Sequence, residues 1–297
     1  MAYQDMIGAA PAAHGLPRVR TIAPRDLIDA LRKGIDDFRT MPTHVIFLSL
    51  IYPVAGLLIA RATFGYDLVP LLYPMAAGFA LIGPFAAVGI YELSRRREQG
   101  SDTAWTHAFD LVHADSFRAI LALGLVLVAI FGVWVAAAHA IYVSHFGYAA
   151  PESIEAFVRQ VLTTPAGHSL ILIGNFVGFL FALVAFCISV VAFPLLVDRN
   201  ISATAAAATS IKAVLRNPLT MMLWGLIVAI VLLIGSLPLF FGLAVAIPVL
   251  GHATWHLYRK VVVPDLPHRE HRPHPRKGPR YAADFPAVLF PVHEKEP

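Results

Sequence analysis

Apolar residues lie in long runs along this chain, and shorter polar segments separate the runs. Crossing the hydrocarbon of a bilayer takes about 20 helical residues, and six runs approach or exceed that length. The fold class predicted from this pattern is therefore all-α, an integral membrane bundle of six transmembrane helices. The predicted spans are residues 43–60, 68–93, 119–143, 170–197, 219–236 and 239–258.

Breaks in the runs predict bends and turns. Pro74 and Pro84 fall within the second predicted span, and Pro194 falls near the end of the fourth. A proline removes a backbone hydrogen-bond donor, so we expect both helices to kink. The stretch 218–258 carries no charge, and its only break signal is at 235–238, where we expect a tight hairpin turn.

A segment of helical periodicity precedes each pair of predicted spans, at 26–42, 101–118 and 202–218. In the first segment apolar residues recur on one side and charged residues lie opposite, a pattern typical of a helix lying flat at the bilayer surface. The apolar residues are Leu27, Ile28, Leu31, Ile35 and Phe38. We predict three hairpins, each preceded by a cytoplasmic interfacial amphipathic helix. The alternative is that any amphipathic linker before a span has this form.

The basic residues predict the orientation of the bundle. All of the 23 Lys and Arg residues except Arg61 and Arg159 fall on one side of the predicted spans. Basic side chains resist translocation, so both termini are expected in the cytoplasm. The net charge of +4 suits an anionic lipid leaflet, and it gives no reason to expect a nucleic acid partner.

Composition divides the chain into three parts. Residues 1–24 are expected to form a flexible N-terminal arm, and residues 25–262 the six-helix membrane domain. The tail, 263–297, is cytoplasmic and rich in Pro, His and Arg, so it cannot build a core. It ends in an apolar segment that we expect to dock on a partner or on the chain's own cytoplasmic face. The docking residues are Tyr281, Phe285, Leu289 and Phe290.

Ionisable residues at mid-depth usually mark function in a membrane protein, and the predicted spans contain none there. Several charged and aromatic residues instead lie at the predicted cytoplasmic boundary, where we expect interfacial anchors. The predicted anchors are Glu92, Arg95, Arg96, Arg97, Trp105, His252, Trp255 and His256.

Small residues within the spans predict close helix contacts. Gly174 and Gly178 flank Asn175 in the fourth span, and Gly132 and Ala136 repeat the spacing in the third. Small residues four apart let two helices approach, and an amide can hydrogen-bond across the contact. The alternative for Asn175 is a contact with a substrate.

No cofactor, metal or catalytic residue is predicted, and the protein is not expected to be an enzyme. The sequence has no phosphate-binding glycine loop, nucleophile elbow or catalytic pair of carboxylates. A single cysteine, Cys187, excludes an intrachain disulfide. His139, His145 and His168 are expected near the outer face, and the sequence leaves open whether they bind anything.

Several stretches together carry a family resemblance: 34–38 with Pro42, 83–95, 193–199, 217–218 and 248–259. Over residues 25–262 the chain resembles a family of predicted bacterial integral membrane proteins that carry a domain of unknown function. The resemblance implies a bacterial inner-membrane location and no established activity. Some members of that family are labelled as cytochrome c oxidase components. This chain lacks the histidine set and paired cysteines of catalytic oxidase subunits.

We therefore expect a non-catalytic accessory, scaffold or assembly subunit of an inner-membrane complex. Its expected partners are membrane lipids and other membrane subunits, with a respiratory cytochrome c oxidase first. One alternative is a transporter or channel for an uncharged or lipid-like solute, because broken helices often surround a translocation path. A second alternative is a haem-binding redox protein.

Overall fold

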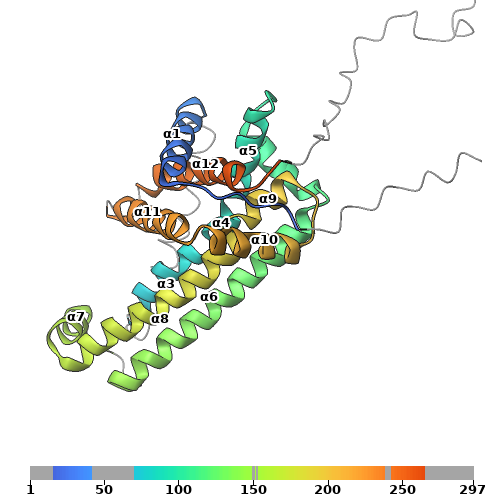
Figure 1. Ribbon diagram of the computed structural model, residues 1–297. Helices are drawn as coiled ribbons and strands as arrows, with labels where there is room; N and C mark the ends of the chain where they lie inside the picture. Colours follow the sequence, from blue (N-terminus) through green and yellow to red (C-terminus); the bar gives the residue numbers. More distant parts are fainter. Residues whose placement is uncertain (1–15, 42–69, 149–150, 152, 238–241, 265–297) are drawn as a thin grey trace, which may run out of the picture. The chain divides into compact units, whose positions relative to one another are not determined.

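The structure is a computed structural model that describes residues 16–41, 70–148, 151, 153–237 and 242–264. The chain divides into two units, Met1–Val263 and Pro264–Pro297, and the described helices all lie in the first (Figure 1). In chain order they are α1 (Pro24–Thr40), α3 (Leu72–Phe79), η2 (Ala80–Ile82), α4 (Gly83–Ala86), α5 (Val88–Glu98), η3 (Trp105–His113), α6 (Phe117–Phe146), α7 (Ile154–Thr163), α8 (Pro165–Ser189), α9 (Ala192–Asp198), α10 (Ala203–Arg216), α11 (Pro218–Ser236) and α12 (Leu243–Val261).

Three stretches among the described residues are long and apolar enough to cross a membrane. They are α6, the α8–α9 stretch Pro165–Asp198, and α11. These stretches contain the third, fourth and fifth predicted spans. The first predicted span, 43–60, lies outside the described residues, so the arrangement of six spans in hairpins stays a prediction. Within the described part of the chain the secondary structure is helical, as predicted.

The second predicted span is broken into the short helices α3, η2, α4 and α5. Pro84 has no backbone N–H, so the carbonyl of Ala80 loses its α-helical partner at the point where the chain tightens into η2. The first piece, α3, packs on α6, where the indole Nε1 of Trp134 donates to the carbonyl of Pro74 at 2.8 Å. The predicted interruption is therefore present, and it produces separate helices rather than one kinked span.

A second break separates α8 from α9. Pro194 cannot donate to the carbonyl of Val190, and the helix is interrupted there. The hydroxyl of Ser210 on α10 accepts a hydrogen bond from the backbone N–H of Val191 at 3.2 Å. A donor at the break is therefore satisfied by a side chain of a neighbouring helix. The residues after the break, from Ala192 to Leu196, are buried.

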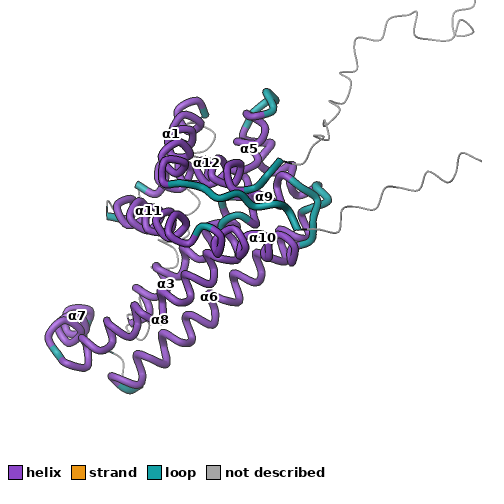
Figure 2. The backbone as a smooth tube through the Cα atoms, in the orientation of Figure 1, coloured by secondary structure: helices purple, strands orange, loops and turns teal. Residues whose placement is uncertain are grey.

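The sixth predicted span corresponds to α12, which begins at Leu243 and is not among the three candidate spans. Its second half is enclosed by protein, with Trp255, Leu257 and Tyr258 buried. Helix α1 runs antiparallel along it, since Asp37 bonds His256 while Asp26 and Asp29 bond Lys260. Figure 2 shows α1 lying beside α12.

Helix α1 packs on protein through a side that shares Leu27 and the partly buried Leu31 with the predicted apolar side. It buries Leu27, Ala30, Gly34 and Asp37, whereas Ile28 and Ile35, both predicted on the apolar side, are exposed. The reason is close packing, because a Cβ placed on Gly34 would lie 2.6 Å from the backbone nitrogen of Ala253. Small residues, rather than the largest apolar ones, determine which side of α1 meets α12.

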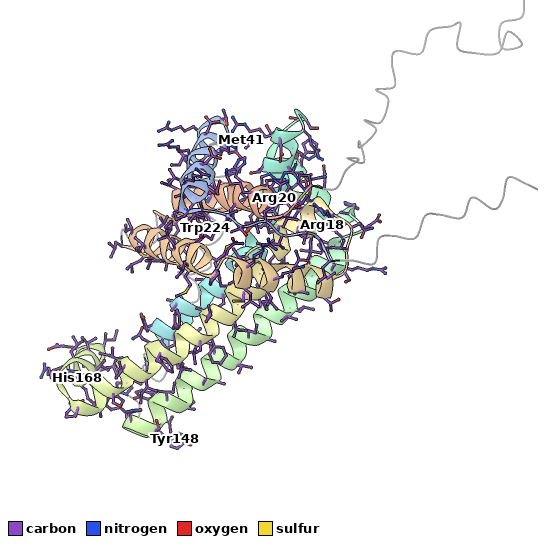
Figure 3. The ribbon with its side chains drawn as sticks, in the orientation of Figure 1. Arg18, Arg20, Met41, Tyr148, His168 and Trp224 are labelled. Carbon is purple, nitrogen blue, oxygen red and sulfur yellow. The ribbon has the colours of Figure 1, made fainter. Side chains whose placement is uncertain are left out.

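The segment 16–23 is ordered, which corrects the prediction of a flexible arm for that part of residues 1–24. Val19 pairs with Val262 in an antiparallel bridge. Asn217 accepts a hydrogen bond from the N–H of Ile22 at 2.8 Å and donates to the carbonyl of Arg20 at 3.0 Å. Figure 3 shows Arg18 and Arg20 in this segment. The start of the described chain is therefore fixed to the beginning of α11.

Of the other two predicted interfacial helices, one forms as an α-helix. It is α10, which Ser202 caps by accepting the N–H of Ala205 at 3.2 Å. The segment 101–118 instead contains the 3-10 helix η3 and the first residues of α6. An amphipathic helix that the sequence analysis missed, α7, connects α6 to α8.

Candidate functional site

Four stretches that carry the family resemblance contribute to three sets of polar contacts, partly buried and partly exposed, which together we call the polar network. The stretches belong to α1, α5, α9 and α12, and their residues are brought together across as many as 219 positions of sequence. The network consists of Asp37, Glu92, Ser94, Arg95, Arg96, Arg97, Glu98, Asp198, His252, Trp255, His256, Tyr258 and Arg259.

Asp37 is the centre of the network and is 4% exposed. Its carboxylate accepts hydrogen bonds from the hydroxyl of Ser94 at 3.1 Å and from Nε2 of His256 at 2.9 Å, and it pairs with the guanidinium of Arg97. Burial opposes ionisation, but the hydrogen bond and charge of His256, with the charge of Arg97, outweigh it and lower the pKa of Asp37. The buried carboxylate is therefore ionised and neutralised by its neighbours.

His252 is fully buried beside Asp37 and Ser94. Its Nδ1 lies 2.5 Å from Oγ of Ser94. Ser94 gives its single proton to Asp37, so the network assigns the His252 proton to Nδ1, which donates to Ser94. Nε2 of His252 then carries a lone pair, and no described residue donates to it.

These three residue types also occur in catalytic triads, but their order here differs. In a triad one imidazole nitrogen faces the serine and the other faces the carboxylate. Here Ser94 and Asp37 both lie on the Nδ1 side of His252, the Asp37 oxygen at 3.6 Å. Ser94 is also buried, with its proton committed to Asp37. This geometry does not activate Ser94 as a nucleophile.

Glu92 forms a second buried ion pair and is 1% exposed. Arg95 donates to both of its carboxylate oxygens, at 2.7 and 2.8 Å, and Arg96 donates to one of them at 2.9 Å. Arg96 also reaches Asp110 at 2.7 Å. The basic run 95–97 thus pairs with acidic groups of the same chain.

A third set of contacts joins α12 to α5 and α9. Trp255 and Arg259 donate to the carboxylate of Glu98, at 3.1 and 3.0 Å. Tyr258 donates to Asp198 at 2.5 Å, and Arg259 also reaches that carboxylate at 3.4 Å. Asp198 therefore links α9 to α12 through these hydrogen bonds.

Burial revises the interfacial role predicted for several of these residues. Glu92, His252 and Trp255 have almost no exposed surface, so they contact protein rather than lipid headgroups. His256 and the three arginines are partly buried and bonded within the network. Trp105 is the first residue of η3, and its side chain is not among those that the structure describes.

Asp37, Ser94 and Glu98 were missed by the sequence analysis. A signal for Asp37 was present, because Leu27, Ala30, Gly34 and Asp37 share one face by their spacing. An acidic residue on a face of small and apolar residues indicates a buried partner. No comparable local signal marks Ser94 or Glu98, which lie beside charged residues.

The predicted packing residues have different surroundings. A Cβ on Gly178 would lie 2.9 Å from the ring of Trp134, so this glycine lies against α6. Gly132 and Gly174 have no such neighbour within 4 Å, and Ala136 is exposed. Asn175 is exposed and accepts a hydrogen bond from the hydroxyl of Tyr73 on α3 at 2.8 Å. Contacts of the exposed residues with other helices stay predictions.

The outer histidines make local contacts. Nε2 of His145 lies 3.1 Å from the Ser169 hydroxyl, and Nε2 of His168 lies 2.8 Å from the carbonyl of Leu162. His139 is exposed on α6. Among the residues that the structure describes, no cluster of three or more His, Cys, Asp or Glu side chains could hold a metal ion. The predicted docking residues from Tyr281 to Phe290 lie outside the described residues.

Comparison with curated proteins and with solved structures gives no match. One family model does match, over a shorter stretch than the 25–262 of the expected resemblance. Residues 72–198, which contain α3 to α9, match the family described as Predicted integral membrane protein (DUF2189), and this stretch is therefore similar to a family of predicted integral membrane proteins.

Proposed function

We propose that this protein is a non-catalytic accessory, scaffold or assembly subunit of a membrane complex. The observation that carries the proposal is the internal pairing of the polar network. Asp37, Glu92, Glu98 and Asp198 each accept a bond from an Arg, His, Trp or Tyr of another motif or of the adjacent turn. Groups occupied in this way hold helices together, and none of these four paired carboxylates is free to act as a base or nucleophile.

The apolar stretches support the same proposal. Residues 119–146, 165–197 and 218–236 contain no Asp, Glu, Lys or Arg. They also expose large apolar side chains, including Leu125, Phe176 and Leu233. In a membrane such surfaces contact lipid or other transmembrane helices, and helices associate there through packing. The surface is thus suited to contacts with partners.

The experiment is purification of the N-terminally tagged protein from its own membrane in a mild detergent. We expect a partner in a fixed ratio, with the subunits of a bacterial cytochrome c oxidase as the first to look for. Recovery of a monodisperse monomer without a partner would overturn the proposal.

Two variants locate the contact. Replacing Tyr281, Phe285, Leu289 and Phe290 by alanine should reduce recovery of the partner as much as deleting 264–297 does. A Lys295→Ala, Glu296→Ala variant is the matched control, because it changes the tail outside its apolar segment. Equal recovery with all three variants would exclude the tail as the docking segment.

The transporter alternative is favoured by one observation, the breaks in the helices around Pro84 and Pro194. Discontinuous helices often surround a translocation path. Vesicles containing the pure protein should then pass a small neutral solute such as glycerol, or exchange a fluorescent lipid between leaflets, faster than empty vesicles do. Rates equal to those of empty vesicles would dismiss this function.

A further inference from the structure

Helix α7 has an apolar stripe that no other described helix covers. Ile154, Val158 and Leu162 recur every four residues, and their exposed fractions are 41%, 46% and 59%. The other apolar residues of the helix, Phe157 and Val161, lie one step around its circumference. The helix therefore has a broad apolar side, of which the protein covers one edge.

The covered edge is held tightly in place. The ring of Phe157 meets the ring of Tyr142 edge-on, with centroids 6.1 Å apart. A Cβ on Gly167 would lie 2.2 Å from the carbonyl oxygen of Val161, so α7 closes directly onto the start of α8. Ser153 caps the helix by accepting the N–H of Ala156 at 3.1 Å. The exposed stripe is thus presented in a fixed orientation.

An ion pair borders the stripe of α7, and the side opposite the stripe carries Gln160 and Thr163. Glu155 and Arg159 form an ion pair at 2.6 Å, and their side chains are 83% and 70% exposed. The pair has no net charge, so the helix gains nothing from an anionic lipid surface. Its affinity for a bilayer would come from apolar burial alone.

The place of α7 in the chain puts it at the edge of a membrane. It joins the ends of α6 and α8, both of which belong to candidate spans. Figure 1 shows it at the far end of this pair. Aromatic residues gather at the same level, as Tyr142 contacts both Phe146 and Phe157. Tyrosine, like tryptophan, is typical of the membrane–water boundary.

From these observations we infer that α7 lies along the surface of the outer leaflet, with Ile154, Val158 and Leu162 inserted among the lipid chains. The occupant of the stripe is the protein's own bilayer, and neutral lipid is sufficient. This inference does not rest on the proposed accessory role, since it concerns α7 and the bilayer alone.

The test uses the single native cysteine. In a Cys187→Ala background, one cysteine is placed at Val158 or at Leu162, labelled with bimane, and the full chain is reconstituted in phosphatidylcholine vesicles. Quenching by dibromo-phosphatidylcholine should be at least about twofold stronger at both positions than at Gln160→Cys or Thr163→Cys, on the side opposite the stripe. Quenching by aqueous iodide should have the opposite order.

Val133→Cys, near the middle of α6 and 59% exposed, is the control for full lipid exposure. Equal quenching at the apolar and polar positions would overturn the inference, because the stripe would then face water. Weak quenching of Val158 and Leu162 by both reagents would also overturn it, because the stripe would then be covered by protein. Use of vesicles without anionic lipid tests the claim that charge plays no part.

Discussion

Nε2 of His256 on α12 lies 2.9 Å from the carboxylate of Asp37 on α1, although 219 positions of sequence separate the two residues. This contact joins the first and last described helices. Lys260 extends the same junction, because its ammonium lies 2.8 Å from Asp29. We therefore expect this junction to contribute to the free energy of unfolding.

Asp37 should contribute strongly to stability. Removing one partner of a buried ion pair costs about 3–5 kcal/mol, because the other charge stays buried without compensation. We expect Asp37→Asn to lower the free energy of unfolding in detergent by an amount in that range, which a fall of the thermal midpoint would report. The matched control is Asp36→Asn, whose side chain is 68% exposed and pairs with the same Arg97. An exposed pair contributes only about 0–1 kcal/mol, so equal shifts for the two variants would contradict the structure.

Acid should weaken the same junction. The folded-state pKa of Asp37 is lowered, since His256 and Arg97 outweigh the opposing effect of burial. The carboxylate therefore stabilises the fold above its unfolded pKa of about 3.9, and this stabilisation is lost as the pH falls below that value through the folded pKa. Thermal midpoints measured from pH 7 down to pH 3 should fall more steeply for the wild type than for Asp37→Asn. Parallel curves would show that Asp37 is not the group responsible.

Two glycines allow the same substitution to be compared in different surroundings. A Cβ on Gly34 would meet the backbone nitrogen and Cβ of Ala253 at 2.6 and 2.7 Å, and a backbone atom cannot move aside as a side chain can. We expect Gly34→Ala to cost about 1–3 kcal/mol, as overpacking does. Gly132→Ala on α6 meets no atom within 4 Å and should cost nothing. Thermal midpoints of the two variants decide the matter, and a neutral Gly34→Ala would refute the close contact.

Asn217 should control the order of the segment before α1. Its side chain bonds the N–H of Ile22 and the carbonyls of Arg20 and Ala213. Loss of these bonds in Asn217→Ala leaves buried groups without partners, at a cost of about 1–3 kcal/mol. Amide hydrogen exchange of residues 18–23 should accelerate in this variant and stay unchanged in Asn200→Ala, an exposed asparagine. Unchanged exchange in Asn217→Ala would mean that the segment is held by other contacts.

The sequence alone was sufficient to predict the long apolar helices. The third, fourth and fifth predicted spans lie within helices of the structure, and the breaks near Pro84 and Pro194 are present. Both results depend on local properties. Hydropathy is a sum over consecutive residues, and a proline lacks its hydrogen-bond donor in any surroundings.

The amphipathic helix α7 was in principle predictable, because its apolar residues recur at helical spacing between 154 and 162. Its shortness and its position between two spans concealed it. The face of α1 was harder to assign. Two apolar sets compete on this helix, and the choice depends on Ala253 fitting against Gly34, more than two hundred positions away.

The contacts of the polar network between different helices were decided by tertiary structure. Glu92, His252 and Trp255 lie at the ends of apolar runs, and charged and aromatic residues are common at such membrane boundaries. The sequence therefore favoured an interfacial position for them. His252 and Trp255 are buried against partners from α1 and α5, whereas Glu92 pairs with Arg95 and Arg96 of its own helix. The free energy of burying a charge depends on the groups around it, and these groups become neighbours only when the chain has folded. The sequence thus determined which segments are apolar helices, and the packing of α1 against α12 and α5 decided which polar residues are inside.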